Sequence, residues 1–267
     1  MLKLGGIRVD IDSIGDIDAL PATLDLLDGC GVKASFFVAM GPDKTGKNLF
    51  KYLKRPWDLK KARPSRFGFL NLLRGLIGPE LMEEHKTELR GIEKRGHEVG
   101  LHGYGHYRWM NTCGKKSAGD IEKGRAIFED VFKCAPRSFA SPGFFVNNKI
   151  LRKIDGAGFD YSSDFIGDEP FYPTLMGERF NTLQVPVCIK SIGEFIAEGL
   201  GEGRIFDAYM QELIKRRFFT FYFHPSYEVK TSMELLDKVI RNLKEFTEIL
   251  TFAEIAGKWK NENIADL

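Results

Sequence analysis

The residues best suited to chemistry are two histidines and two aspartates. His102 and His106 lie four residues apart with two glycines between them, a spacing at which both imidazoles can bind one metal ion if the chain turns tightly. Taken alone, such a pair is more often two ordinary, partly buried histidines. Asp10 and Asp12 alter the balance, because alternation along a strand points both carboxylates to one face. Asp12 and the two histidines would supply three ligands and leave one position open to water, as catalytic zinc sites do.

The other aspartate and a third histidine fit proton-transfer roles. Asp10, beside a metal-bound water, can accept its proton as general base, or else it only supports or bridges the metal. His224 follows another strand-like segment and is placed to protonate a departing amine, with Asp164 holding its ring and raising its pKa. Considered alone, His224 would be a capping residue before Pro225. Together these residues predict metal-assisted hydrolysis of an amide.

Such residues need a scaffold that brings distant strand ends together. Short β-rich runs alternate with longer segments whose apolar residues recur every three or four positions, which is typical of β-α units around a mostly parallel sheet. We expect strands at 6–11, 33–39, 97–101, 137–141, 159–163, 182–187, 218–223 and 249–252. We expect helices at 17–27, 79–95, 121–132, 149–155, 206–216 and 233–246. Seven or eight such units predict an α/β barrel, in which reactive groups lie just past the C-terminal ends of the strands.

Length and composition narrow the class further. With 267 residues and 43% hydrophobic content, the chain can bury the core of one barrel domain spanning 1–267. A net charge of +2 argues against a nucleic-acid partner, and four scattered cysteines without C-x-x-C spacing favour a reducing compartment. There is no apolar N-terminal signal and no run approaching about 18 apolar residues. We therefore expect a cytoplasmic protein that does not span a membrane.

One segment breaks the β-α rhythm and is interpreted as an insertion. From 41 to 78 the chain has no clear strand and interleaves basic with large apolar residues. The cations are Lys44, Lys47, Lys51, Lys54, Arg55, Lys60, Lys61, Arg63 and Arg66, and the apolar residues are Phe50, Tyr52, Leu53, Trp57 and Leu59. This pattern fits peripheral contact with anionic lipid on the inner face of the membrane. A solvated helical hairpin packed on the barrel explains it equally well.

The order of short motifs along the chain resembles a known family. The motifs are V-D-I-D at 9–12, H-G-Y-G-H at 102–106, F-A-S-P-G-F at 139–144, D-Y-S-S-D at 160–164, F-H-P at 223–225 and L-T-F-A-E-I at 250–255. They resemble the NodB-homology polysaccharide deacetylases, carbohydrate esterase family 4. Gly41-Pro42-Asp43 and the basic insertion are similar to the branch that deformylates 4-deoxy-4-formamido-L-arabinose linked to phosphoundecaprenol. The likeness covers almost the whole chain.

The resemblance implies a distorted (β/α)7 barrel holding one divalent metal ion, with zinc expected and Co2+, Mn2+ or Ni2+ as alternatives. The implied site residues are the metal ligands Asp12, His102 and His106, the base Asp10, the acid His224 and its partner Asp164. In the turn that begins at Pro142, a backbone N–H of Gly143 or Phe144 is expected to bind the oxyanion.

The chain also departs from the family pattern. Many members carry an arginine that pairs with the base, and Ala140 stands at that position here. Arg8 and Arg137 are the two candidates to replace it, and the sequence does not decide between them. The segment Pro225-Ser226-Tyr227-Glu228 also differs from the more acidic one of the deformylase branch, which leaves the sugar open.

The predicted reaction removes an N-formyl or N-acetyl group from an amino sugar. The basic and aromatic insertion favours a sugar carried on a polyprenyl phosphate over a soluble one. A deacetylase of soluble oligosaccharides or of cyclic amides would share the metal site. A non-catalytic sugar-lipid-binding protein would need one of the site positions lost, and none of the matched positions is. No protein partner is indicated.

Overall fold

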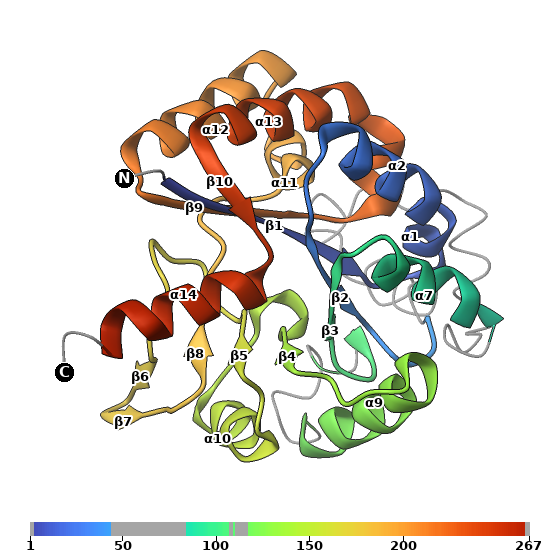
Figure 1. Cartoon of the computed structure of the whole chain (residues 1–267), viewed down its shortest axis with the longest axis vertical. Coiled ribbons are helices and arrows are strands. Elements are labelled where there is room, and N and C mark those ends of the chain that lie inside the picture. The colour runs from blue at the N-terminus through green and yellow to red at the C-terminus, as the bar shows by residue number, and fades with distance from the viewer. Residues whose placement is uncertain (1–2, 44–83, 107–108, 110–116, 265–267) are drawn as a thin grey trace.

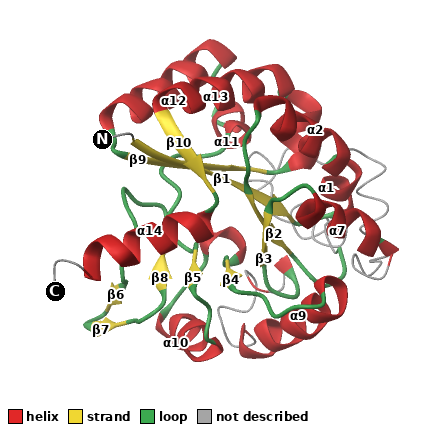
Figure 2. Cartoon of the chain, in the orientation of Figure 1, coloured by secondary structure: helices red, strands yellow, loops and turns green. Residues whose placement is uncertain are grey.

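The computed structural model describes residues 3–43, 84–106, 109 and 117–264. Strands lie inside the molecule and helices surround them (Figures 1 and 2). The strands of the main sheet are β1 Lys3–Ile11, β2 Ser35–Val38, β3 Glu98–Leu101, β4 Ser138–Phe139, β5 Tyr161–Ser162, β8 Leu183–Gln184, β9 Phe218–Phe223 and β10 Thr247–Leu250. All of the pairings in this sheet are parallel.

The sheet curls into a distorted barrel of seven strands. From β1 the order runs through β2, β3, β4 and β5 to β8, and β9 pairs with the other edge of β1. Between β8 and β9 the ring is closed by a backbone hydrogen bond of 2.8 Å from Cys188 N–H to the carbonyl of Thr220. The eighth strand, β10, pairs with the first half of β1, on the edge that β2 takes over further along. The expected (β/α)7 barrel in a single domain is confirmed.

Helices cover the outside of this ring. The helices are α1 Ile14–Asp18, α2 Leu20–Cys30, α7 Lys86–Lys94, α9 Ser117–Phe132, α10 Asn148–Ala157, α11 Ile192–Ala197, α12 Glu202–Lys215, α13 Met233–Phe246 and α14 Phe252–Ile264. Because parallel strands are covered on both faces, they are mostly apolar, as in the fully buried run F-F-T-F-Y-F of β9. In Figure 1, α14 passes in front of β4, β5 and β8. Its Ala253 N–H donates to Glu98 at the start of β3, so α14 lies at the N-terminal end of the barrel, away from the strand ends that carry the site.

All eight expected strands exist, and most differences are at their boundaries. The helix expected at 17–27 is two helices with a break at Ala19, because Pro21 begins a new helix more readily than it continues one. Two helices, α11 and α14, were not expected, nor was the hairpin of β6 Thr174–Leu175 and β7 Glu178–Arg179. Of the helix expected at 79–95, the structure describes 84–95, and α7 occupies 86–94 of that part.

The insertion lies almost wholly outside the described residues, except for its first three positions. Gly41 passes so close to the backbone of Tyr104 that a Cβ at Gly41 would lie 2.1 Å from the Tyr104 carbonyl oxygen. The buried Asp43 carboxylate accepts a hydrogen bond of 3.2 Å from Ile14 N–H at the start of α1. Gly41-Pro42-Asp43 therefore fixes the chain against α1 and against the segment that contains Tyr104.

Two further expectations can be compared with the described residues. No helix among them is long and apolar enough to cross a membrane. Cys30, Cys134 and Cys188 are free thiols, and Cys113 lies outside the described part.

Candidate active site

The end of β1 and the segment after β3 bring Asp12, His102 and His106 together. Asp12 Oδ1 lies 3.3 Å from His102 Nε2, and Asp12 Oδ2 lies 3.1 Å from His106 Nε2. Gly103 allows this approach because it turns the chain between the histidines with a φ of 72°, a region that side chains disfavour. One donor atom from each of the three residues lies within 4.8 Å of the others. The sequence therefore identified a cluster that the fold does assemble.

His102 is held in the form that binds metals. Its Nδ1 lies 2.7 Å from the Ala140 carbonyl oxygen, which can only accept, so Nδ1 carries the proton and Nε2 presents a lone pair towards Asp12. Burial lowers the pKa of His102 to about 4, which keeps the ring neutral at physiological pH. Burial opposes ionisation of Asp12, but the nearby imidazoles of His106, His102 and His224 outweigh it and lower the Asp12 pKa.

These three residues fit a divalent metal ion on chemical grounds. Asp12 Oδ1 and His102 Nε2 are buried, and neither has a hydrogen-bond partner among the described residues. Orphaned buried polar atoms are costly unless something else satisfies them. Ligands about 2.1 Å from a tetrahedral zinc ion lie about 3.4 Å apart, close to the separations measured between Asp12 and the two histidines. One carboxylate and two imidazoles form a donor set that suits zinc and similar ions.

Asp10 is held by Arg8, which settles what replaces the family arginine. Arg8 Nε and Nη2 donate to the two oxygens of Asp10 at 2.7 and 2.8 Å, and Arg8 Nη1 donates to the Ser163 carbonyl at 2.6 Å. Both charged side chains are buried, so the pair depends on this two-point geometry. The other candidate, Arg137, pairs with Asp160 and is 85% exposed. Asp10 Oδ2 lies 4.0 Å from His102 Nε2, beside the metal-binding cluster.

Aromatic rings surround the guanidinium of Arg8. The rings of Phe37, Phe144 and Tyr222 have their centroids 5.2, 4.8 and 5.9 Å from Arg8 Cζ. These contacts exclude water from the guanidinium and compensate part of the cost of burying it. The ring of Phe144 therefore contacts Arg8, the residue that holds the Asp10 carboxylate.

The turn predicted to bind the oxyanion is a short 3-10 segment, Pro142–Phe144. Gly143 and Phe144 both have positive φ, 62° and 55°, and a left-handed phenylalanine is an unusual and strained conformation. Phe144 N–H already donates to the Ser141 carbonyl at 3.1 Å, so Gly143 is the better candidate of the two donors. The indole N–H of Trp109 donates to the Phe145 carbonyl at 3.0 Å and ties the turn to the segment that contains His106.

His224 enters the cluster from the end of β9. Its Nε2 lies 3.4 Å from Asp12 Oδ2, and its ring packs edge-on against Tyr222. Burial opposes its charge, but the contact with Asp12 and the field of Glu228 raise the pKa of His224 to about 9. The fold therefore brings the predicted acid beside the predicted metal ligands.

Asp164 is not placed as expected. Its buried carboxylate accepts hydrogen bonds from Ser141 N–H at 2.7 Å, from the Ser162 hydroxyl at 2.5 Å and from the Gln184 amide at 3.1 Å. These donors come from the segment just after β4, from β5 and from β8, and none comes from His224. The carboxylate braces neighbouring strand ends because those strands present the nearest donors. The prediction that Asp164 orients the His224 ring is corrected accordingly.

Two buried carboxylates near the cluster were not anticipated. Glu228 accepts hydrogen bonds of 2.9 Å from the backbone N–H groups of His224 and of Gly193 at the start of α11. Asp16 in α1 accepts from the backbone N–H groups of Asp12 and Ser226. Burial, together with the neighbouring Asp12 carboxylate, raises the pKa of Asp16. Their positions, four residues after Asp12 and after His224, carried no motif in the sequence.

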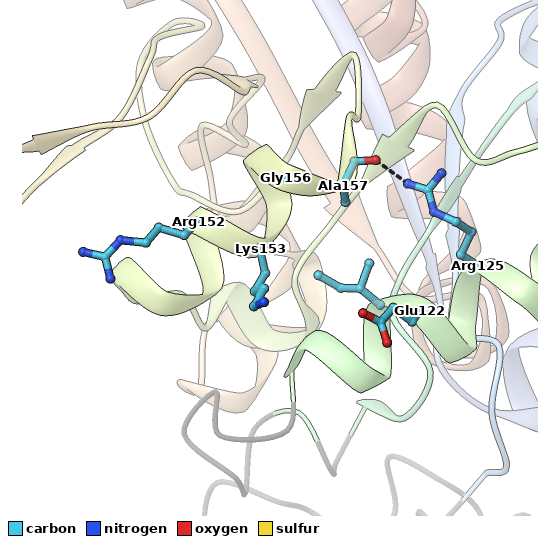
Figure 3. A pocket seen from close by; sticks show the side chains of 7 residues that line it. Glu122, Arg125, Arg152, Lys153, Gly156 and Ala157 are labelled. Atoms are coloured by element: carbon cyan, nitrogen blue, oxygen red, sulfur yellow. Dashed lines mark hydrogen bonds between the residues drawn. The ribbon is translucent and has the colours of Figure 1, made fainter.

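A groove of about 390 Å³ between α9 and α10 lies apart from these residues (Figure 3). Arg125 donates to the Ala157 carbonyl across it, and Arg152 pairs with Glu178. These cations join elements of the fold, and the lining includes none of the predicted site residues.

With the barrel and the cluster described, comparison with known proteins identifies the class. Residues 12–162 match the family model of the polysaccharide deacetylases. That span is more than half of the chain, so this chain belongs to the polysaccharide deacetylase family.

Two curated relatives with the same name are similar in sequence to this chain. A protein from Wigglesworthia glossinidia brevipalpis, named as the 4-deoxy-4-formamido-L-arabinose-phosphoundecaprenol deformylase ArnD, is 31% identical over 187 residues. That match covers 66% of this chain and 65% of the relative, slightly under two thirds of its length. A relative of the same name from Shewanella sediminis is 27% identical over 252 residues, covering 90% of this chain and 81% of that one.

Solved structures agree on the fold. A structure from Mycobacterium smegmatis assigned to the polysaccharide deacetylases has a TM-score of 0.69 and 17% identity, covering 97% of this chain and 91% of that one. A second, from Pseudomonas aeruginosa PAO1 and with the same assignment, has a TM-score of 0.70 and 11% identity over the same shares. At these identities the likeness concerns the barrel alone.

Proposed function

We propose that this protein hydrolyses the N-acyl amide of an amino sugar with the help of one divalent metal ion, zinc being the best fit. The observation that carries the proposal is the convergence of Asp12, His102 and His106 within 4.8 Å, with Asp10 and His224 beside them. A protein that only bound sugars would have no need of a buried, arginine-held carboxylate next to three histidine rings.

The roles follow from what each side chain touches. Asp12, His102 and His106 would hold the ion, which when bound polarises the acyl carbonyl and acidifies a water. Asp10 accepts the proton of the attacking water, because Arg8 fixes its carboxylate next to the cluster. His224 Nε2 lies 3.4 Å from Asp12 Oδ2, the same oxygen that His106 approaches, and His224 protonates the nitrogen of the departing amine.

The turn at Pro142–Phe144 closes the site on one side. Gly143 N–H is proposed to donate to the oxygen of the tetrahedral intermediate, where a preorganised backbone donor contributes most to catalysis. The products are a carboxylic acid and a free amino sugar, whose new ammonium group adds one positive charge at neutral pH. Asp164 has no part in proton transfer and instead holds the strand ends at Ser141, Ser162 and Gln184 together.

The finer proposal is that the acyl group is formyl and that the sugar is carried on a polyprenyl phosphate. The two ArnD relatives support it, as does the segment Gly41-Pro42-Asp43 that the structure packs beside the site. The basic and aromatic insertion, which lies outside the described residues, would then contact anionic lipid with Lys51, Lys54, Arg55, Lys60 and Lys61. In that role the protein would act at the inner face of the membrane.

The test compares substrates at equal concentration. Purified protein is incubated with a formamido sugar on a polyprenyl phosphate, with the same sugar free of lipid, and with an N-acetylated oligosaccharide. Released formate and acetate are measured. Faster formate release from the lipid-linked sugar, together with vesicle binding that weakens with salt, supports the full proposal.

Other outcomes limit or reject the proposal. Equal turnover of free and lipid-linked sugar would leave only the amide-hydrolase assignment. Acetate release alone would favour a deacetylase of soluble oligosaccharides. Removal of an acetyl group has its own support in 31% identity over 71 residues, 27% of this chain, to a Bacillus cereus relative named peptidoglycan-N-acetylglucosamine deacetylase. No hydrolysis of any amide by metal-loaded protein would overturn the proposal.

A further inference from the structure

One buried carboxylate connects two parts of the site that are far apart in sequence. Asp16 is 1% exposed. Its Oδ2 accepts hydrogen bonds from Asp12 N–H at 3.1 Å, from Ser13 N–H at 3.0 Å and from the Ser13 hydroxyl at 2.7 Å. Its Oδ1 accepts from Ser226 N–H at 2.8 Å, across a sequence separation of 210 residues. The same side chain therefore binds the backbone of metal ligand Asp12 and the backbone two residues after His224.

Capping of α1 explains only part of this arrangement. Ser13 and Asp16 form a capping box, a common device at the start of a helix. That device uses Oδ2 alone. A helix of five residues needs no second oxygen aimed at a distant strand end, so the bond from Ser226 must have a separate consequence.

The bond from Ser226 sets where the turn after β9 lies. This turn, Pro225–Val229, is one turn of π-helix that packs against α1, and it begins immediately after His224. On the other side, Glu228 accepts the backbone N–H of His224 itself at 2.9 Å. The main chain around His224 is thus held at two points by buried carboxylates, and only Asp16 also holds the strand end that carries Asp12.

We propose that Asp16 is a positioning residue that fixes the separation between the metal ligand Asp12 and the acid His224. This inference rests on the proposed function, because it assumes that both residues act in one reaction. Their side chains are 3.4 Å apart, and an error of about 1 Å in such a distance can cost a hundredfold in rate. A carboxylate that accepts hydrogen bonds from both strand ends limits their movement relative to each other, since its two oxygens are rigidly connected.

Asp16→Asn tests the bridge with the smallest change in shape. An asparagine has one acceptor oxygen, so its NH2 group must face an N–H donor on one of the two sides. We expect kcat to fall at least about tenfold, KM to change less than about threefold, and metal content to stay near one ion per chain. Asp155→Asn is the matched control, because Asp155 accepts from Asn181 N–H, Thr182 N–H and the Thr182 hydroxyl, far from the site. It should lose comparable stability but keep kcat.

Ser226→Pro breaks the same bridge from the other end and serves if Asp16→Asn does not fold. Proline removes the N–H that Asp16 accepts, and it is tolerated in the first turn of a helical segment. The capping box of Ser13 and Asp16 is untouched. The loss in kcat should match that of Asp16→Asn. In a protein that also carries His224→Ala, neither change should reduce kcat further, because the acid that Asp16 positions is absent.

Amide hydrogen exchange tests the Asp16 hydrogen bonds to both strand ends without an activity measurement. In Asp16→Asn, exchange should accelerate in both 10–14 and 224–229, and in Asp155→Asn in neither. If wild-type protein hydrolyses no amide, the proposed function fails while this exchange result still decides the bridge. If wild-type protein is active, unchanged kcat in Asp16→Asn and Ser226→Pro would overturn the positioning role. Losses that simply add to that of His224→Ala would overturn it as well.

Discussion

Arg8 donates two hydrogen bonds, of 2.7 and 2.8 Å, to the carboxylate of Asp10, its neighbour two residues along the same strand. Both side chains are buried. The position at which the family resemblance predicts this arginine holds Ala140, and Arg8 of β1 pairs with Asp10 instead. Asp10, the proposed base, and Arg8 therefore lie on the same strand, and contacts from other elements, such as the Ser163 carbonyl, hold the arginine in place.

Arg8→Lys should separate charge from geometry. A lysine keeps one positive charge but cannot make two parallel bonds to Asp10, so turnover should fall at least about tenfold with metal content unchanged. Arg137→Lys is the matched control at the exposed arginine and should leave turnover unchanged. Steady-state kinetics with metal analysis checks both, and full activity in Arg8→Lys would show that Asp10 needs only a nearby charge.

Asp10→Asn and His224→Ala should each keep the metal and lose at least about a hundredfold in turnover. Asp10 and His224 lie beside the cluster but outside the three-ligand set, and positioned acids and bases contribute about this much. Single-turnover rates with metal-loaded variants provide the measurement. If either variant kept near-normal rates, protons would have to move by another route.

His224 should make the stability of metal-free protein fall at alkaline pH. The contact with Asp12 raises its pKa in the folded protein from 6.5 to about 9. This stabilisation is fully present below about pH 6.5 and is lost as pH rises through about 9, for a total of roughly 3 kcal/mol. Urea unfolding of metal-free wild type and His224→Gln at pH 6.5 and 9.5 should show the difference between them shrinking with pH. A constant difference would contradict the contact.

His97 should act in the opposite pH range. Its side chain is fully buried, its Nδ1 accepts a hydrogen bond from Ala34 N–H at 3.1 Å, and burial lowers its pKa to about 4. Because the folded protein keeps this ring neutral, stability is present above about pH 6.5 and is lost as pH falls towards 4. In His97→Gln the side chain can still accept a hydrogen bond from Ala34 N–H but does not titrate. The free energy of unfolding of this variant should therefore fall by roughly 3 kcal/mol less than that of wild type between pH 7 and 4. Parallel acid profiles for the two proteins would refute this account.

Periodicity and strand-end chemistry predict the barrel and the grouping of Asp12, His102 and His106 from sequence. All eight strands of the main sheet were expected, because buried parallel strands lie in short, mostly apolar runs between helical segments. Asp12, His102 and His106 could be found because histidine and aspartate side chains just past the ends of predicted parallel strands form a chemically specific pattern. Alternation also places Arg8 on the same face as Asp10, a signal sufficient in principle to prefer it over Arg137.

Other features depend on contacts that no local pattern encodes. Asp164 ends a strand like the other reactive residues, and only the neighbouring Ser141 and Gln184 show that its carboxylate is already occupied. Asp16 and Glu228 look like helix-capping or surface acids in sequence, since their partners are backbone N–H groups and leave no mark in residue types. The helix α14 was missed because its mixture of polar and apolar residues has weak periodicity.

Metal content measured together with turnover shows whether Asp12, His102 and His106 hold a divalent ion that the reaction needs. Protein purified without an affinity tag is analysed by plasma emission, as wild type, as His106→Ala and as His85→Ala, a partly exposed histidine on α7's boundary that takes no part in the cluster. We expect one divalent ion per chain in wild type and in His85→Ala, with equal amide hydrolysis. In His106→Ala we expect loss of both metal and activity, because a three-ligand site has no spare ligand. Full metal occupancy and turnover in His106→Ala would contradict the assignment of these three residues as the metal ligands.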